Sequence, residues 1–175
     1  MSFRGPQALS DTPEGVPFRS FHTVSEAPPF QGPEYLILSN RGKLMFEVSV
    51  DYTFAAGHAL RSYQGKCENV HGHNYKVRVT IAGNQLDSTG LLVDFVDLRA
   101  AIKAVVDRLD HRFLNDLSPF DQINPSAENL AKYFCDEIAP QLSDSRLQIH
   151  AVTIWETDLT FATYRPSSKD QEKEA

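Results

Sequence analysis

The sequence predicts an α+β fold in which an antiparallel four-stranded sheet carries two helices on one face. Two strand-like runs come first, two segments of helical spacing follow, and β-branched residues return towards the C-terminus. Strands that are separated from the helices along the chain favour an antiparallel sheet with the helices segregated to one side.

The first two strands, over about residues 44–54 and 73–83, are predicted from alternating apolar positions, because every second side chain of a strand shares a face. Their apolar faces are Phe46, Val48, Val50, Tyr52 and Phe54 in the first strand and Tyr75, Val77, Val79 and Ile81 in the second. Continued without a bulge, the first face reaches His58, and counted back by twos the second reaches His73 and His71. If the strands pair, three imidazoles converge at one end of the sheet, which is the ligand set of a catalytic zinc site with an open fourth position. The alternative is three ordinary polar residues near a loop.

Two helices are expected in the middle of the chain. The first spans about residues 95–108 with Asp94 as its N-cap, and the second begins with Asn124 as cap and Pro125 in the first helical position. Their buried stripes follow the helical period: Leu98, Ala101, Ile102, Val105 and Leu109 in the first, and Ala127, Leu130, Ala131, Phe134 and Ile138 in the second. Two more strands are predicted over residues 148–157 and 161–164.

The domain organisation follows from composition. Residues 1–43 hold six of the ten prolines and four of the nine glycines, which predicts an extended arm that is partly disordered. The folded domain is expected over residues 44–166, and the charged segment 167–175 is expected to be a disordered tail.

Length and charge exclude several classes of protein. A chain of 175 residues with a net charge of −6 and a pI near 5.5 is one ordinary domain without the basic face of a general nucleic-acid binder. Two cysteines make no disulfide framework, and the sequence shows no signal peptide or apolar span of about 20 residues that would place it in a membrane. The default expectation is a cytoplasmic protein.

Four further residues are candidates for chemistry. Cys67 lies four positions before His71, close to the predicted metal ligands. Three roles are open: a thiolate base or nucleophile beside the metal, a fourth metal ligand, or no role in the site. Asp110 and His111 allow two interpretations. The carboxylate favours the protonated imidazole, which would then act as a proton donor. Alternatively, His111 only stabilises the C-terminus of the helix through the helix dipole. Glu156 shares a face with apolar residues, so it accepts two N–H groups of a ligand or is a buried structural acid.

With these residues identified, the chain from about Phe46 to Tyr164 resembles the family of 6-pyruvoyltetrahydropterin synthase and 6-carboxytetrahydropterin synthase. The shared landmarks are FAAGH at 54–58, CENVHGHNY at 67–75, VDF at 93–95, LDH at 109–111, Asn115, PSAEN at 125–129 and WET at 155–157. Several motifs in the same order make the resemblance specific.

The resemblance implies the site and the assembly. Zinc would bind His58, His71 and His73, and Cys67 would act as general base with Asp110 and His111 completing the proton-transfer set. Glu156 would hold the amino-pyrimidinone edge of the pterin, and Ser126, Ala127 and Glu128 would contribute to the base pocket. The implied fold is the tunnelling fold, in which homo-oligomers, trimers or hexamers, close a barrel with sites at subunit interfaces.

The spacing C-x3-H-G-H resembles the 6-carboxytetrahydropterin branch of the queuosine (7-deazaguanine) pathway. The implied reaction converts 7,8-dihydroneopterin triphosphate, a small-molecule substrate, to 6-carboxy-5,6,7,8-tetrahydropterin, acetaldehyde and triphosphate. Lys66, Arg61 and Arg112 are candidate cations for the triphosphate.

Glu68 fits a second pattern, E-x2-H-G-H, of a related branch that makes 6-hydroxymethyl-dihydropterin for folate. The alternatives are therefore a 6-pyruvoyltetrahydropterin synthase, a dual enzyme that also makes the folate intermediate, and a pterin-binding or metal-binding module without catalysis.

Overall fold

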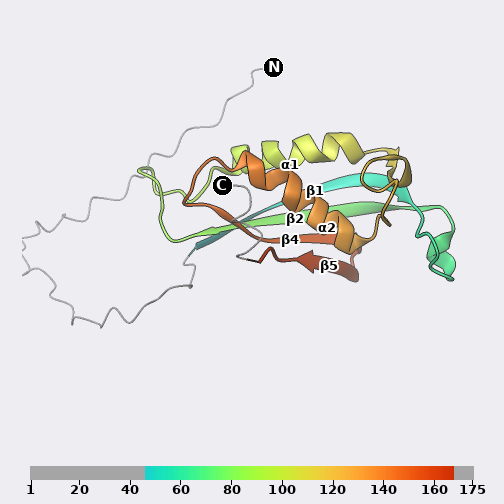
Figure 1. The fold of residues 1–175 in the computed structure, drawn as a ribbon. Helices are drawn as coiled ribbons and strands as arrows, with labels where there is room; N and C mark the ends of the chain where they lie inside the picture. Colours follow the sequence, from blue (N-terminus) through green and yellow to red (C-terminus); the bar gives the residue numbers. More distant parts are fainter. Residues whose placement is uncertain (1–45, 168–175) are drawn as a thin grey trace, which may run out of the picture. The chain divides into compact units, whose positions relative to one another are not determined.

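The computed structural model describes residues 46–167. The strands are β1 (Phe46–His58), β2 (His71–Gly83), β3 (Arg112–Phe113), β4 (Gln148–Thr157) and β5 (Thr160–Tyr164), and the helices are α1 (Phe95–Leu109) and α2 (Ala127–Ile138). They form a single sheet in the order β3-β1-β2-β4-β5, with both helices over one face of it (Figure 1). The predicted α+β fold is confirmed. The arm predicted over residues 1–43 and all but the first residue of the predicted tail lie outside the described residues.

The centre of the sheet is the β1–β2 hairpin, which pairs without a bulge from Phe46 opposite Gly83 to His58 opposite His71. This register places the even positions of β1 and the odd positions of β2 on the same face, as the alternation predicts. β1 ends four residues later than predicted, because the small residues Ala55, Ala56 and Gly57 continue the ladder with β2 instead of starting a loop.

The sheet corrects the sequence prediction in one respect. A fifth strand, β3, pairs with β1 in parallel, with Ala56 opposite Arg112 and Gly57 opposite Phe113. A strand of two residues is too short to show alternating apolar and polar positions, so the sequence alone does not reveal it. The other three pairings are antiparallel, as predicted.

The helix starts show why one cap prediction holds and the other is wrong. Asp94 caps α1, since its side chain accepts a hydrogen bond from the Val96 N–H at 2.7 Å. The cap of α2 is Ser126 instead of Asn124, and its hydroxyl accepts from the Asn129 N–H at 3.4 Å. Asn124 is unavailable as a cap because its side-chain amide hydrogen-bonds to the backbone of Arg61.

The core lies between the two helices and the sheet face that they cover. Phe54 of β1 stacks on Tyr75 of β2 with ring centroids 5.0 Å apart, and Phe134 of α2 packs against Phe54 at 5.8 Å. Both predicted apolar stripes face this core: Leu98, Ile102, Val105 and Leu109 are buried in α1, and Leu130, Ala131, Phe134 and Ile138 in α2.

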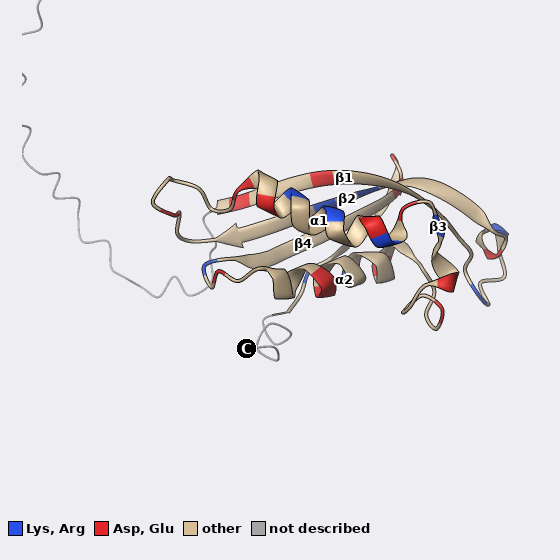
Figure 2. Cartoon of the chain, turned by 90° about the horizontal axis from the view of Figure 1, so that it is seen from above, with Lys and Arg blue, Asp and Glu red and all other residues tan. Residues whose placement is uncertain are grey.

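The opposite sheet face is polar. The ammonium group of Lys76 lies 4.1 Å from the centroid of the Trp155 ring, and the guanidinium of Arg78 pairs with Asp51 at 2.6 Å. The ribbon of α1 carries both basic and acidic positions (Figure 2). One ion pair, between Arg108 and Glu137 at 2.7 Å, joins the two helices.

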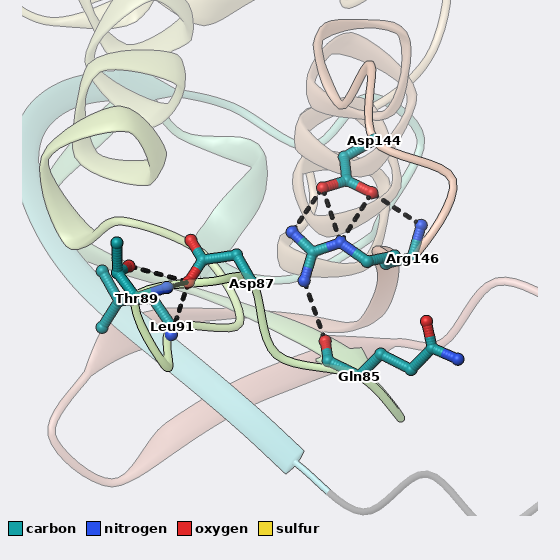
Figure 3. A network of polar contacts seen from close by, with 6 residues as sticks. All are labelled: Gln85, Asp87, Thr89, Leu91, Asp144 and Arg146. Carbon is teal, nitrogen blue, oxygen red and sulfur yellow. Dashed lines mark hydrogen bonds and ion pairs between the residues drawn. The ribbon is translucent and has the colours of Figure 1, made fainter.

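A network of polar contacts closes the end of the sheet that is remote from the histidines (Figure 3). Asp87 accepts a hydrogen bond from the Leu91 N–H at 2.9 Å, which fixes the turn after β2. Arg146 binds the carboxylate of Asp144 and also donates to the Gln85 carbonyl at 2.9 Å. The loops that follow β2 and precede β4 are thereby joined.

No helix within residues 46–167 has the length and apolar character needed to cross a membrane.

Candidate active site

Three histidines meet where the β1–β2 hairpin ends. His58 lies directly opposite His71, and His73 lies two residues further along the same face of β2. The ring centroid of His58 lies 4.4 Å from that of His71 and 5.2 Å from that of His73, and the centroids of His71 and His73 are 5.0 Å apart. The convergence that the alternation predicts is therefore present, with one ligand nitrogen of each ring within 4.8 Å of the others.

The hydrogen bonds of the rings direct their lone pairs towards one another. The Nδ1 of His58 lies 2.8 Å from the Pro125 carbonyl, and the Nδ1 of His71 lies 2.8 Å from the Asn69 carbonyl. A carbonyl oxygen only accepts hydrogen bonds, so each of these two rings carries its hydrogen on Nδ1 and presents the lone pair of Nε2. The two Nε2 atoms face each other at 3.0 Å, and the buried Nε2 of His73 has no hydrogen-bond partner among residues 46–167.

This arrangement fits a divalent metal ion. Two nitrogens bound at ~2.0–2.1 Å to a tetrahedral zinc ion are about 3.4 Å apart, close to the observed 3.0 Å separation. Carbonyl groups on the far nitrogens are also the usual outer partners of histidine ligands. Because burial lowers the pKa of His58, this ring stays neutral and can bind a cation.

Glu156 of β4 faces the histidines, as its shared parity with Val152 and Ile154 predicts. Its Oε1 lies 4.0 Å from the Nε2 of His58, and its side chain keeps 27% of its exposure, so the carboxylate remains accessible to a ligand. The β4 register shifts between Trp155 and Thr157, at the position of Glu156.

Tyr75 lies beneath the same cluster. Its ring packs edge-on against His58 and His73 with centroids 5.8 and 5.4 Å apart, and its buried hydroxyl has no hydrogen-bond partner in the described part of the chain. Burial raises the pKa of Tyr75, so the hydroxyl stays protonated and can donate. The alternation in β2 predicted Tyr75 as a core residue and gave no sign of this polar end.

Cys67 lies in the loop between β1 and β2, in the single 3₁₀ turn Lys66–Glu68. Its side chain is half-buried, whereas the neighbouring Glu68 is exposed. Its carbonyl accepts a hydrogen bond from the Leu60 N–H at 2.9 Å, two residues beyond His58. Within the described residues the cluster of possible metal ligands contains the three histidines and not Cys67.

Asp110 and His111 form the predicted pair, with the Oδ2 of Asp110 2.9 Å from the Nδ1 of His111. The other carboxylate oxygen accepts from the Ala55 N–H at 2.9 Å, and this bond is the main reason that the pKa of Asp110 is lowered. The N–H of His111 donates to the Ala55 carbonyl at 2.6 Å, while the His111 side chain is 82% exposed. His111 and His73 line the same open hollow of about 430 Å³, but His111 does not join the histidine cluster.

Comparison with known proteins identifies the family. The family model described as 6-pyruvoyl tetrahydropterin synthase matches residues 47–167. The chain belongs to the 6-pyruvoyl tetrahydropterin synthase family. It is 35% identical over 128 residues to the 6-carboxy-5,6,7,8-tetrahydropterin synthase of Bacillus subtilis, covering 69% of this chain and 86% of the relative. It is 38% identical over 127 residues to the 6-pyruvoyl tetrahydrobiopterin synthase of Drosophila melanogaster, covering 65% and 75%.

A solved structure of the same family has the same fold. The 6-pyruvoyl tetrahydropterin synthase of Caenorhabditis elegans superposes with a TM-score of 0.61 and 31% sequence identity, covering 71% of this chain and 99% of the other.

The remaining predicted site residues lie in the first turn of α2 and in the adjacent loops. Ser126 caps the helix, Ala127 is buried and Glu128 is exposed. The preceding residue, Pro125, provides the carbonyl that orients His58, so this turn adjoins the histidines. Arg61 is already engaged, since its guanidinium donates to the Phe120 and Ile123 carbonyls at 2.6 Å each. The other two candidate cations, Lys66 and Arg112, are exposed.

Proposed function

We propose that this protein is a zinc-dependent 6-carboxy-5,6,7,8-tetrahydropterin synthase of queuosine biosynthesis. It would convert 7,8-dihydroneopterin triphosphate to 6-carboxytetrahydropterin, acetaldehyde and triphosphate. The observation that carries the proposal is the convergence of three histidine rings at the end of the hairpin, flanked by the partly exposed carboxylate of Glu156. The C-x3-H-G-H spacing from Cys67 to His73 supports this product over the pyruvoyl product, while relatives of both names are similar to the chain.

His58, His71 and His73 would hold the zinc ion, which would supply Lewis acidity towards the hydroxyl groups of the substrate side chain. The protein's contribution is to orient the rings of His58 and His71. The Pro125 and Asn69 carbonyls do this by fixing the proton of His58 and His71 on Nδ1.

Glu156 would bind the pterin ring. A carboxylate accepts two adjacent N–H groups in a bidentate pair, which matches the amino-pyrimidinone edge. Its position 4.0 Å from His58 supports a substrate whose ring lies against β4 and whose side chain reaches the histidines. Ser126, Ala127 and Glu128 at the first turn of α2 would border the ring.

Cys67 would be the general base, and the Asp110–His111 pair would complete the proton transfers. The half-buried position of Cys67, next to exposed Glu68, supports the cysteine as the base. The exposed His111 ring lies at the outer edge of β1, which supports a site completed between copies of the chain, in the trimer or hexamer that the resemblance implies. The homo-oligomer and the cytoplasmic location stay predictions.

The test is to incubate the purified protein with 7,8-dihydroneopterin triphosphate and to identify the products by mass. Cys67→Ala should keep zinc and the folded state but lose turnover, because it removes the base and leaves the histidines intact. Cys135→Ala, which removes the other, buried thiol from α2, should keep turnover. A Cys67→Ala variant that loses zinc would instead indicate a structural metal site with the cysteine as fourth ligand.

A second activity is a candidate because Glu68 directly follows Cys67 and its side chain is exposed at the same turn. In this alternative Glu68 would support formation of 6-hydroxymethyl-dihydropterin. Assaying both products with Cys67→Ala and Glu68→Ala separately decides it, and absence of the folate-type product from every variant would remove the second activity. A wild-type protein that binds the pterin and releases no product would be a binding module.

A further inference from the structure

Just beyond the end of β1, side-chain amides make the backbone hydrogen bonds that a neighbouring strand would make. The Oδ1 of Asn115 accepts from the Ala59 N–H at 2.9 Å, and its Nδ2 donates to the Ala59 carbonyl at 2.8 Å. One carboxamide therefore makes both hydrogen bonds that a strand residue would make with Ala59.

Asn124 repeats this arrangement two residues further on. Its Oδ1 accepts from the Arg61 N–H at 2.7 Å, and its Nδ2 donates to the Arg61 carbonyl at 3.0 Å. Asn129 of α2 donates to the Asn124 carbonyl at 2.8 Å and so anchors this residue to the helix. Together Asn115 and Asn124, here called the amide clamp, continue the edge of β1 that β3 occupies as far as Gly57.

The residue between the two clamped positions faces the other way. The N–H groups of Ala59 and Arg61 bond to the amide clamp, whereas the Leu60 N–H does not. It donates to the Cys67 carbonyl at 2.9 Å. Cys67 and the clamp therefore bond to opposite sides of residues 59–61.

The segment that carries the amide clamp contacts both His58 and the backbone next to Cys67. Pro125, the residue after Asn124, holds the His58 ring through its carbonyl. The segment that carries the clamp therefore contacts both the last residue of β1 and the backbone that positions Cys67. A shift of Ala59 or Arg61 would move Leu60, and with it Cys67, relative to the histidines.

We infer that Asn115 and Asn124 are positioning residues, which hold the Cys67 thiol at its working place beside the histidine cluster by acting as the strand partner of Ala59 and Arg61. The inference rests on the proposed function, in which Cys67 is the general base. Neither amide touches the reacting groups in this account. Both act through the backbone of residues 59–61.

Asn115→Asp and Asn124→Asp test this in the full-length protein. Each aspartate keeps the shape of the side chain but replaces the donor with an oxygen that faces a carbonyl, so one bond is lost and repulsion is added. Gln122→Glu is the matched control, because it adds the same charge to an exposed residue of the same segment whose amide contacts Asp121. The measurements are the rate of Cys67 alkylation by iodoacetamide, read by peptide mass, the zinc content, the melting temperature, and kcat and KM.

Both clamp variants should keep one zinc ion per chain and alter the alkylation rate of Cys67 several-fold. Their kcat should fall by about 100-fold, the loss that a misplacement of about 1 Å can cause, with a much smaller change in KM. Gln122→Glu should match the wild type in all of these. If Asn115→Asp fails to fold, Asn124→Asp decides, since its bonds to Arg61 lie at the exposed end of the clamp.

Folded clamp variants with the alkylation rate and kcat of Gln122→Glu would overturn the inference. Loss of zinc and kcat at an unchanged alkylation rate would overturn it as well, because the amides would then support the histidines and not the thiol. If the wild type turns over no pterin triphosphate, the proposed function fails, and the alkylation rates alone still decide whether the clamp positions Cys67.

Discussion

Replacing His71 with glutamine should remove the stabilisation that zinc gives to the folded chain. The ring of His71 is already oriented by the Asn69 carbonyl, and its Nε2 lies 3.0 Å from that of His58. Because the folded chain presents these nitrogens together and the unfolded chain does not, zinc binds the folded state preferentially and raises its stability.

The size of the effect follows from the binding equilibrium. At a free zinc concentration 100 times the Kd, the folded state gains about 2.7 kcal/mol. One kcal/mol corresponds to about 4 °C for a domain of this length, so the melting temperature should rise by about 10 °C. Loss of a single outer partner of a metal ligand weakens binding by 10–100-fold, so loss of the ligand itself should cost at least about 100-fold. At the same free zinc the gain then falls to about 0.4 kcal/mol, or about 2 °C.

The assay is thermal unfolding of chelator-treated protein with and without buffered zinc. His150→Gln is the control, because this histidine lies on β4 near Glu47, at 3.4 Å, and outside the cluster. It should keep the full shift. A wild-type melting temperature that zinc does not change, or a shift of equal size in His71→Gln, would refute the reasoning.

Two further predictions concern stability. In the metal-free protein, burial holds the pKa of His58 below its ordinary value of 6.5. As the pH drops, the unfolded chain therefore binds the proton first, so stability that is present above pH ~6.5 falls towards the lower folded pKa. Urea unfolding at several pH values should show this fall. In His58→Gln the free energy of unfolding should change less steeply with pH. Phe134→Ala should lower the free energy of unfolding by about 3–5 kcal/mol, because the ring is fully buried against Phe54, and an unchanged urea midpoint would contradict this.

The sequence was sufficient for the part of the site that depends on strand periodicity. Alternate side chains share a face whatever their identity, so His58, His71 and His73 could be placed together before any contact was known. The same rule placed Glu156 on the face of Val152 and Ile154. The N-cap of α1 was also predictable, because Asp94 acts on the helix that it adjoins in the chain.

The features that the sequence did not reveal depend on contacts between distant segments. Asn124 has the residue type and the position of an N-cap, but its amide binds Arg61, which is 63 positions away, and Ser126 caps the helix instead. Asn115 likewise bonds to Ala59 from 56 positions away. Local patterns carry no information about which of two competing partners a side-chain amide selects.

All three metal ligands come from one hairpin, with His58 and His71 only thirteen positions apart, whereas the Pro125 carbonyl that orients His58 is 67 positions away. Closing so short a loop costs little chain entropy and is fast, while docking a distant helix is slower. A nascent hairpin would thus offer an ion its complete ligand trio before α2 arrives. Metal capture would then come early in folding, and arrival of Pro125 would afterwards lock the first ring in place.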